Sequence, residues 1–209
     1  MEIILGKTSG FCFGVKNAID GAEAELKNSD RVYCLGEIVH NEEVIKDLEQ
    51  KGLTIIDDIT DANDKVIIRA HGVAKEVYEV AGAKNIELID FTCPFVYKIH
   101  ETVIEYSNKN YFIFLLGIKN HPETIGTISF CNENSCLIED LEDVGNAIKI
   151  LEASGLKNLL IISQTTFSVS LFEDIVNKVK SQISSNINCE IKNTICKNKY
   201  LMIVQNLCI

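Results

Sequence analysis

The stretch Tyr111-Phe112-Ile113-Phe114-Leu115-Leu116-Gly117-Ile118-Lys119-Asn120-His121-Pro122-Glu123 contains a strand, a turn and the start of a helix. Residues 112–116 are apolar on both faces of a strand, as in a strand buried within a parallel sheet. Gly117 lets the backbone approach a ligand closely, and Pro122 suits the first position of a helix. The stretch predicts a parallel sheet with polar groups at a strand end.

The same alternation of strand and helix extends in both directions. Strands are expected at Glu2–Leu5, Val32–Leu35, Val66–Arg69, Ile86–Ile89, Tyr111–Leu116, Leu159–Ser163 and about 189–195. Apolar residues at helical spacing lie between them. Examples are Val15, Ala18, Ile19, Ala22 and Leu26, then Val73, Val77 and Val80, then Val169, Phe172, Ile175, Val176 and Val179. The predicted fold class is α/β, built from repeated three-layer units with mostly parallel sheets.

Composition excludes several classes of protein. The chain has 209 residues, of which 46% are hydrophobic and 24% charged, and its formal net charge is −10. An acidic chain lacks the basic face that broad nucleic-acid binding needs. Its apolar runs fall well short of the ~20 residues of a transmembrane helix, and its first residues do not read as a signal peptide. We therefore expect a cytoplasmic protein with no membrane or nucleic-acid partner.

Eight cysteines are spread along the chain without any Cys-x-x-Cys spacing. In a reducing cytosol they are expected to be thiols, so a metal site would have to be assembled by the fold. Three segments share a plan of strand, polar turn and cysteine, and they end at Cys12, Cys93 and Cys196. A boundary near Pro94 would divide the chain into two units of about a hundred residues. The echo would place one cysteine per unit around a common centre.

Polar residues gather where the predicted strands end, which is where ligands bind in open α/β sheets. His40, His71 and His121 each follow a strand and precede a helix. Helix N-termini and histidine N–H groups suit an anion. Glu123 could act beside His121 as a proton donor or positioning group, and the hydroxyl of Thr165 follows another strand.

Each of these residues also has a purely structural interpretation. A histidine at a turn is often a helix cap, and Glu123 after a proline could simply favour the helix dipole. Residues 164–168 could form a capping run for the next helix. His100, within an apolar helix, is interpreted as structural, and cysteines without supporting context as small core hydrophobes.

Six motifs then occur in order along almost the whole chain. They are Gly10-Phe11-Cys12-Phe13-Gly14-Val15, His40-Asn41, Ala70-His71-Gly72-Val73, Asp90-Phe91-Thr92-Cys93-Pro94, Gly117-Ile118-Lys119-Asn120-His121-Pro122-Glu123 and Gln164-Thr165-Thr166. Together they resemble the 4-hydroxy-3-methylbut-2-enyl diphosphate reductase family, which completes the non-mevalonate isoprenoid pathway. The resemblance runs from Met1 to about Cys196.

The resemblance implies three α/β units in pseudo-threefold arrangement around a [4Fe–4S] cluster. The units would be 1–93, 94–190 and 191–209, the last a stub, and the N-terminal strand belongs either to the first unit or with the third. Matching the motifs places the three cysteine ligands at Cys12, Cys93 and Cys196, which leaves one iron open to substrate. The family's diphosphate-binding histidines fall on His40, His71 and His121. Its proton donor falls on Glu123, and its substrate-orienting threonine on Thr165.

The implied reaction is the reductive removal of an allylic hydroxyl from a small diphosphate substrate. Two electrons arrive singly from a ferredoxin or flavodoxin, Glu123 supplies protons, and water leaves. Isopentenyl and dimethylallyl diphosphates are the implied products. The three histidines and the helix N-termini would concentrate positive potential where the diphosphate binds to this acidic chain.

After Cys196 the family's downstream pattern does not follow, and the tail to Ile209 reads as if out of frame. We expect a chain truncated before most of its third unit, with a labile cluster and little bound iron after anaerobic reconstitution. The alternative function is a non-catalytic remnant that binds the diphosphate without a stable cluster. A zinc site using Cys12, Cys93 and a histidine is a third reading, although no zinc spacing is present.

Overall fold

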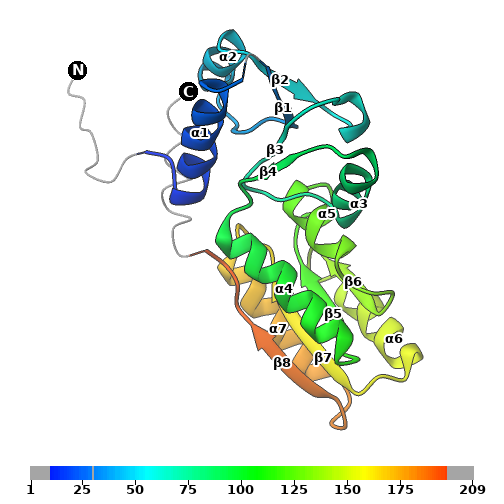
Figure 1. Cartoon of the computed structure of the whole chain (residues 1–209). Coiled ribbons are helices and arrows are strands. Elements are labelled where there is room, and N and C mark those ends of the chain that lie inside the picture. Colours follow the sequence, from blue (N-terminus) through cyan, green and yellow to red (C-terminus); the bar gives the residue numbers. More distant parts are fainter. Residues whose placement is uncertain (1–9, 30, 197–209) are drawn as a thin grey trace, which may run out of the picture. The chain divides into compact units, whose positions relative to one another are not determined.

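The computed structural model describes residues 10–29 and 31–196, which form two compact units (Figure 1). The first unit contains the described residues up to Ala70, then Val80–Cys93 and Cys196. The second contains His71–Glu79 and Pro94–Ile195. The expected strand at Glu2–Leu5 and the tail after Cys196 lie outside the described residues.

The first unit is built on a four-stranded parallel sheet in the order β2-β1-β3-β4. Its elements are α1 (Phe13–Leu26), β1 (Val32–Leu35), α2 (Glu42–Gln50), β2 (Leu53–Ile56), η1 (Ile59–Asp61), β3 (Val66–Ile68), the end of α3 (Lys75–Lys84) and β4 (Leu88–Asp90). Helices α1 and α2 bury Ala18, Ala22 and Leu48 against the sheet. Asn41 caps α2 as predicted, with its side-chain oxygen accepting the Val44 N–H at 3.2 Å.

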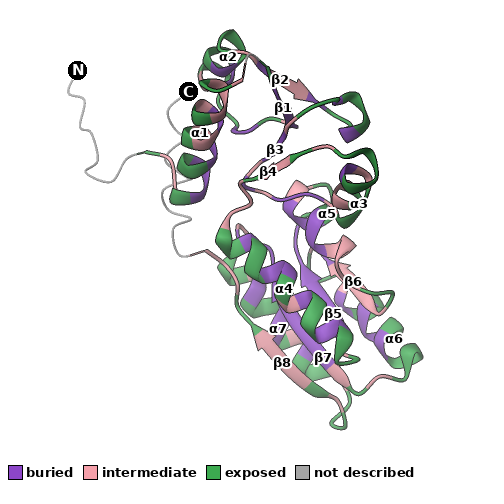
Figure 2. Ribbon diagram, in the orientation of Figure 1, coloured by how far each residue is buried: buried purple, intermediate pink, exposed green. Residues whose placement is uncertain are grey.

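The second unit repeats this plan with strand order β6-β5-β7-β8, again all parallel. Its elements are α4 (Pro94–Asn108), β5 (Phe112–Leu116), α5 (Pro122–Ser129), β6 (Ser135–Ile138), α6 (Val144–Ser154), β7 (Asn158–Ser163), α7 (Val169–Gln182) and β8 (Asn188–Lys192). Phe112, Phe114 and Ile161 face α6 and α7, whereas Ile113 and Leu115 face α4. Figure 2 shows the resulting buried strands between half-buried helices, which confirms the α/β prediction.

The two sheets correspond residue by residue at their carboxyl ends. Gly36 donates its N–H to Ile56 O at 2.8 Å, and Gly117 donates to Ile138 O at 3.1 Å in the same place. Leu35 pairs with Ile68 in one sheet, and Leu116 pairs with Ser163 in the other. The residues that follow β3 and β7 are therefore counterparts.

The edge strands β4 and β8 both lead through the same turn to a cysteine. The Asp90 carboxylate accepts the Thr92 N–H at 2.8 Å, and the Asn193 side-chain oxygen accepts the Ile195 N–H at 3.1 Å. Cys93 and Cys196 stand directly after these turns. The strand-turn-cysteine echo is thus present in both described copies.

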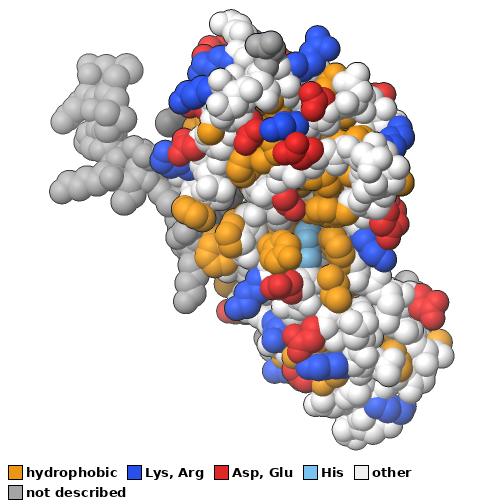
Figure 3. Space-filling view, viewed as in Figure 1, with side chains coloured by type: hydrophobic (Ala, Val, Ile, Leu, Met, Phe, Trp, Pro, Cys, Tyr) orange, Lys and Arg blue, Asp and Glu red, His pale blue; other side chains and the backbone are white. Residues whose placement is uncertain are grey.

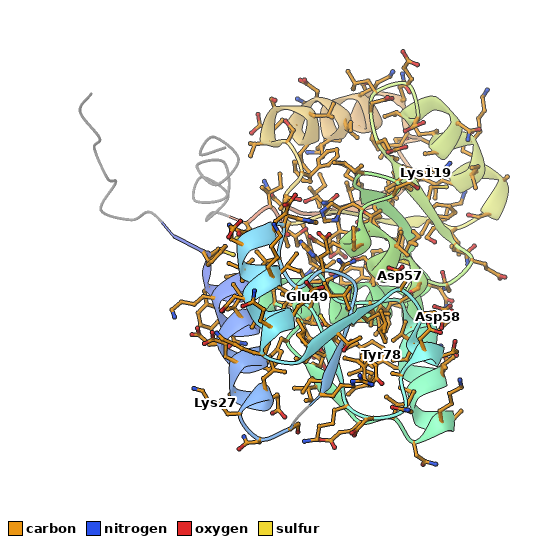
Figure 4. The ribbon with its side chains drawn as sticks, turned by 90° about the horizontal axis from the view of Figure 1, so that it is seen from above. Lys27, Glu49, Asp57, Asp58, Tyr78 and Lys119 are labelled. Carbon is orange, nitrogen blue, oxygen red and sulfur yellow. The ribbon has the colours of Figure 1, made fainter. Side chains whose placement is uncertain are left out.

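The segment 71–79 belongs with the second unit although it follows a strand of the first. Lys75 donates its N–H to the Ser129 hydroxyl at 2.8 Å, and the ring of Tyr78, labelled in Figure 4, lies 6.3 Å from that of Phe130. The expected inner face of this helix was only partly right. Val73 is buried but precedes α3, whose buried residue is Ala81.

Candidate functional site

Glu123, the carboxylate among the predicted site residues, is deeply buried. It lies in the first turn of α5, which begins at Pro122 as predicted, and only 1% of it is exposed. One carboxylate oxygen, Oε1, accepts the Thr165 N–H at 2.6 Å. The other, Oε2, accepts the Thr165 hydroxyl at 2.7 Å. The structure therefore brings together two residues that lie on different predicted elements.

Burial and hydrogen bonding act in opposite directions on Glu123. Burial disfavours the charged carboxylate and raises its pKa, whereas the two hydrogen bonds from Thr165 lower it. Burial is the larger influence, so the pKa of Glu123 is raised above that of an ordinary glutamate. A carboxyl group with a raised pKa is more readily available as a proton donor near neutral pH.

His121 has a structural part in the same turn. Its Nδ1 accepts the N–H of Glu123 at 3.1 Å, which caps α5. Because Nδ1 is the acceptor, the proton of the neutral ring is on Nε2, which makes that nitrogen a donor. The ring of His71 meets that of His121 edge-on at 5.3 Å between centroids. His121 thus caps α5, in agreement with the structural interpretation of a histidine at a turn, and its role at a ligand stays a prediction.

His40 belongs to the first unit and is exposed, with Nδ1 3.5 Å from the Glu37 carboxylate. It occupies the position in the first unit that His121 occupies in the second, since each histidine follows the glycine at the end of the central strand by the same number of residues. Its role at a ligand stays a prediction.

Cys12 and Cys93 both lie at the N-terminal end of α1. Cys12 is the N-cap residue, and its thiol makes no capping hydrogen bond. A Cβ on Gly14 would stand 2.9 Å from Cys93 Sγ, so glycine at this position allows Cys93 to approach the first turn of α1. Thiolates are the form of cysteine that binds metal. These two donors therefore fit an iron–sulfur group.

Cys196 is half-buried and is the counterpart of Cys93 in the second repeat. Among the residues that the structure describes, no three His, Cys, Asp or Glu side chains are grouped closely enough to hold a metal ion. The three-cysteine site, and likewise the zinc alternative, stay predictions. The Thr92 hydroxyl, next to Cys93, is buried with no hydrogen-bond partner in the described part of the chain. A buried polar group of this kind is consistent with a ligand site beside Cys93.

The remaining titratable core residues behave as structural groups. His100 is 4% exposed and stacks on Phe130 with ring centroids 4.5 Å apart, in agreement with its structural interpretation. Burial raises the pKa of Cys34 to about 12, and it raises that of Cys131 to about 12 as well. Both thiols stay protonated at neutral pH.

The hydrogen-bond partners of two polar side chains at the strand ends were not predicted from the sequence. Gln164, which follows β7, places its side-chain amide among Ile118, Thr124 and Thr166. Thr194, just before Ile195 and Cys196, hydrogen-bonds to the N–H, hydroxyl and carbonyl of Ser163. Their position beyond a strand end was visible in the sequence, but most of their partners lie on other elements, in α5, β7 and the turn after β5.

Charge on the surface is mixed. Figure 3 shows acidic and basic side chains interspersed on the face that it displays, with no broad basic area. None of the described helices is long and apolar enough to cross a membrane.

A sequence model described as "LytB protein" matches residues 3–200. The chain belongs to the LytB family. The predicted resemblance is confirmed by relatives named 4-hydroxy-3-methylbut-2-enyl diphosphate reductase. The relative from Alkaliphilus oremlandii is 42% identical over 199 residues, which are 94% of this chain and 68% of the relative. The relative from Aquifex aeolicus is 38% identical over 94% of this chain and 66% of its own length.

Two solved structures of diphosphate reductases have the same fold as this LytB chain. The E-1-hydroxy-2-methyl-but-2-enyl-4-diphosphate reductase from Plasmodium falciparum superposes with a TM-score of 0.82 at 34% identity. The match covers 93% of this chain and 60% of that chain. A second structure, titled as the terminal enzyme of the non-mevalonate pathway, gives 0.81 at 36% identity and is covered to 69%. This LytB chain thus spans 60–69% of the length of these relatives and solved structures.

Proposed function

We propose that this chain has the activity named for its LytB relatives, 4-hydroxy-3-methylbut-2-enyl diphosphate reductase, and that the reaction is a reductive dehydroxylation. In that reaction 4-hydroxy-3-methylbut-2-enyl diphosphate takes up two electrons and two protons. Its allylic C–O bond breaks, water leaves, and isopentenyl or dimethylallyl diphosphate forms. The observation that supports this proposal is the buried Glu123–Thr165 pair, an acid with a raised pKa joined to a hydroxyl.

Glu123 would supply protons by way of Thr165. In the ionised state the Thr165 hydroxyl donates to Glu123 Oε2 at 2.7 Å. Once Glu123 is protonated, its own O–H can donate to Thr165 Oγ1, and the threonine proton is then turned toward a ligand. A proton accordingly moves from carboxyl to hydroxyl to substrate without water entering the buried pair.

The diphosphate would be held by His40, His71 and His121. The proton on His121 Nε2 follows from the hydrogen bond at its Nδ1 and provides a donor for a phosphate oxygen. His71 stands beside it at 5.3 Å between ring centroids. Such donors answer the difficulty of binding an anion on a chain with a net charge of −10.

Cys12, Cys93 and Cys196 would hold a [4Fe–4S] cluster through their thiolates. When bound, the cluster supplies the two electrons of the reduction one at a time, received from a donor of the ferredoxin or flavodoxin type. The arrangement of Cys93 against Gly14 at the start of α1 supports two of these ligands. The repeat that equates Cys196 with Cys93 supports the third.

The test compares wild type with Glu123→Gln after anaerobic reconstitution, with turnover expressed per iron bound because little iron is expected to be retained. Glutamine keeps the shape of the side chain but has no acidic proton, so turnover should fall by about 10²–10⁴-fold. Calorimetry should show substrate affinity within a few-fold of wild type. Glu42→Gln, the change at the equivalent exposed position of the first unit, should leave turnover unchanged.

Other outcomes would overturn the proposal. Substrate binding by wild type without any turnover would favour the alternative, a diphosphate-binding protein without redox chemistry. Equal turnover by wild type and Glu123→Gln would remove the carboxyl group from the reaction. Absence of both binding and turnover would exclude both functions.

A further inference from the structure

Gln164 is held rigidly at the carboxyl end of β7. It is 1% exposed, and its backbone N–H donates to Leu116 O on the neighbouring strand at 2.8 Å. Its side-chain Oε1 accepts two hydrogen bonds, from the Ile118 N–H and the Thr124 hydroxyl, both at 3.1 Å. Its Nε2 donates to Thr166 Oγ1 at 2.7 Å. The amide group therefore has a partner on both of its ends.

These partners are the neighbours of the Glu123–Thr165 pair. Thr124 follows Glu123 in α5, and Thr165 stands between Gln164 and Thr166. The Gln164 side chain thus joins the turn that carries the acid to the turn that carries the hydroxyl. We propose that Gln164 is a positioning residue that sets Glu123 and Thr165 in register for proton transfer, a role that rests on the proposed reductase function.

The backbone leaves room for this link at a single glycine. A Cβ on Gly117 would lie 2.7 Å from Thr124 Oγ1 and 3.3 Å from Gln164 Oε1. Real Cβ atoms do not approach so closely, so a side chain there would displace the hydroxyl or the amide. The Gln164 link thereby gives glycine at position 117 a reason besides the predicted approach to a ligand.

The first unit has a link of the same kind but with a charge. Arg69 is the counterpart of Gln164 by strand register, and its Nη1 donates to Glu37 O at 3.2 Å across the same strand ends. A Cβ on Gly36 would stand 2.7 Å from that nitrogen. In the second unit a Cβ on Gly117 would similarly crowd Thr124 and Gln164. The first unit has Ala70 where the second has Thr165, and so has no acid–hydroxyl pair to position.

A neutral link suits the acid beside it. An arginine at position 164 would stabilise the ionised carboxylate, whereas an amide leaves Glu123 free to take up a proton. Among the described residues, His121 Nδ1 accepts the N–H of Glu123, and the ring of His71 lies against that of His121. Gln164 is linked to Glu123 through its hydrogen bond with Thr124 and through its chain neighbour Thr165, which donates to the carboxylate.

The test uses the full chain without cluster or substrate, so it does not depend on turnover. Three variants are compared with wild type: Gln164→Leu, Gln164→Glu and Ser168→Ala. The last removes the α7 cap, where the Ser168 hydroxyl accepts the Leu171 N–H, and so lowers stability without touching the link. The readouts are amide hydrogen exchange at Ile118 and Thr165 and the carbon-13 NMR titration of the Glu123 carboxyl.

In Gln164→Leu the Ile118 and Thr165 amides should exchange about tenfold faster relative to Ile161 in β7. The Ile118 N–H loses its acceptor, and the bond from the Thr165 N–H to Glu123 is loosened. The Glu123 titration should move toward that of an ordinary glutamate as water enters. Gln164→Glu keeps the shape, so amide protection should hold while the added negative charge raises the pKa of Glu123 further. Ser168→Ala should alter none of these readouts.

The proposal is overturned if Gln164→Leu leaves both amides and the Glu123 titration unchanged, or if Ser168→Ala produces the same changes. Should Gln164→Leu fail to fold, Gln164→Glu decides, because an unchanged Glu123 titration in that variant also overturns it. Failure of wild-type turnover would remove the reductase function but leave these readouts intact, so the two outcomes are distinguishable.

Discussion

At the scale of single residues, the Glu123 carboxyl group is in an environment that favours its neutral form. Within residues 10–29 and 31–196, Thr165 donates to both of its oxygens, through one N–H and one hydroxyl. Burial outweighs these bonds and raises its pKa above that of the same group in the unfolded chain. The protonated form is therefore favoured by folding, which makes stability depend on pH.

The first prediction concerns Glu123→Gln and the free energy of unfolding. A raised pKa in the folded state means that the carboxyl stabilises the fold fully below its unfolded pKa, and that this contribution is lost as pH rises through the folded pKa. Glutamine never ionises, so the variant should unfold at higher denaturant concentration than wild type at pH 8. The difference should shrink as pH falls through the ordinary glutamate range.

The measurement is chemical denaturation at several pH values, with Glu42→Gln as control. Glu42 is exposed, with only a 3.5 Å contact to Lys46, so its variant should stay within about 0.5 kcal/mol of wild type. A Glu123→Gln difference that does not change with pH would contradict the raised pKa.

Glu42 and Glu123 also show where sequence reasoning reaches its limit. Each follows a histidine by two residues, past the central strand of its sheet. One side chain is 88% exposed and the other residue is 1% exposed. The difference arises at the next strand, where Thr165 in one unit replaces Ala70 in the other. The candidate acid was visible in the sequence, but its partner required strand pairing.

At the scale of elements, the end of β7 is tied to the turn after β8. The Thr194 hydroxyl accepts the Ser163 N–H at 3.0 Å, lies 3.2 Å from the Ser163 hydroxyl and also bonds to the Ser163 carbonyl. Ser163 is fully buried. This contact fixes the segment from which Cys196 extends.

The second prediction is that Thr194→Val lowers the free energy of unfolding by about 1–3 kcal/mol, since valine has the same shape but leaves the buried N–H of Ser163 without its acceptor. Denaturant unfolding measures the loss. Thr194→Ser keeps the hydroxyl and should recover most of it. If serine were no better than valine, packing of the threonine methyl would be the cause instead.

The third prediction concerns the contact between α1 and the segment after β4. A Cβ on Gly21 would lie 2.1 Å from Phe91 Cζ, so Gly21→Ala must displace the ring from the core of the first unit. We expect a loss of about 1–3 kcal/mol in denaturant unfolding. Gly82→Ala in α3, where a Cβ meets nothing within 4 Å, should instead gain about 0.5–1 kcal/mol. Equal effects of the two changes would contradict this contact.

The central strands were the most predictable elements. Val32–Leu35, Val66–Ile68 and Phe112–Leu116 are buried on both faces, so their sequences are apolar throughout. The edge strands β2 and β6 were not predicted, because Leu53–Ile56 and Ser135–Ile138 are short and only half-buried. Their place depends on pairing with β1 and β5, which the local sequence does not encode.

At the scale of the whole molecule, the chain contains two sheets of the same topology, and each presents a different set of side chains at its strand ends. Both sheets have a glycine after the central strand, a link across the strand ends and a cysteine after the edge strand. Only the second has the acid–hydroxyl pair, and only the first has α1 with Cys12. Sequence reasoning found the repeat because the cysteine turn recurs in a recognisable form.

The last prediction follows from this repeat. If Cys93 and Cys196 are equivalent ligands, Cys93→Ser and Cys196→Ser should each lower the iron bound after anaerobic reconstitution. Cys189→Ser is the matched control, since Cys189 is a half-buried thiol within β8 whose pKa is raised by burial. Iron content and the visible absorption of the cluster are the measurements. We expect a labile cluster, so each sample is assayed before and after exposure to a chelator. Iron that is unchanged in Cys196→Ser, or lost equally in Cys189→Ser, would contradict the equivalence of the two turns.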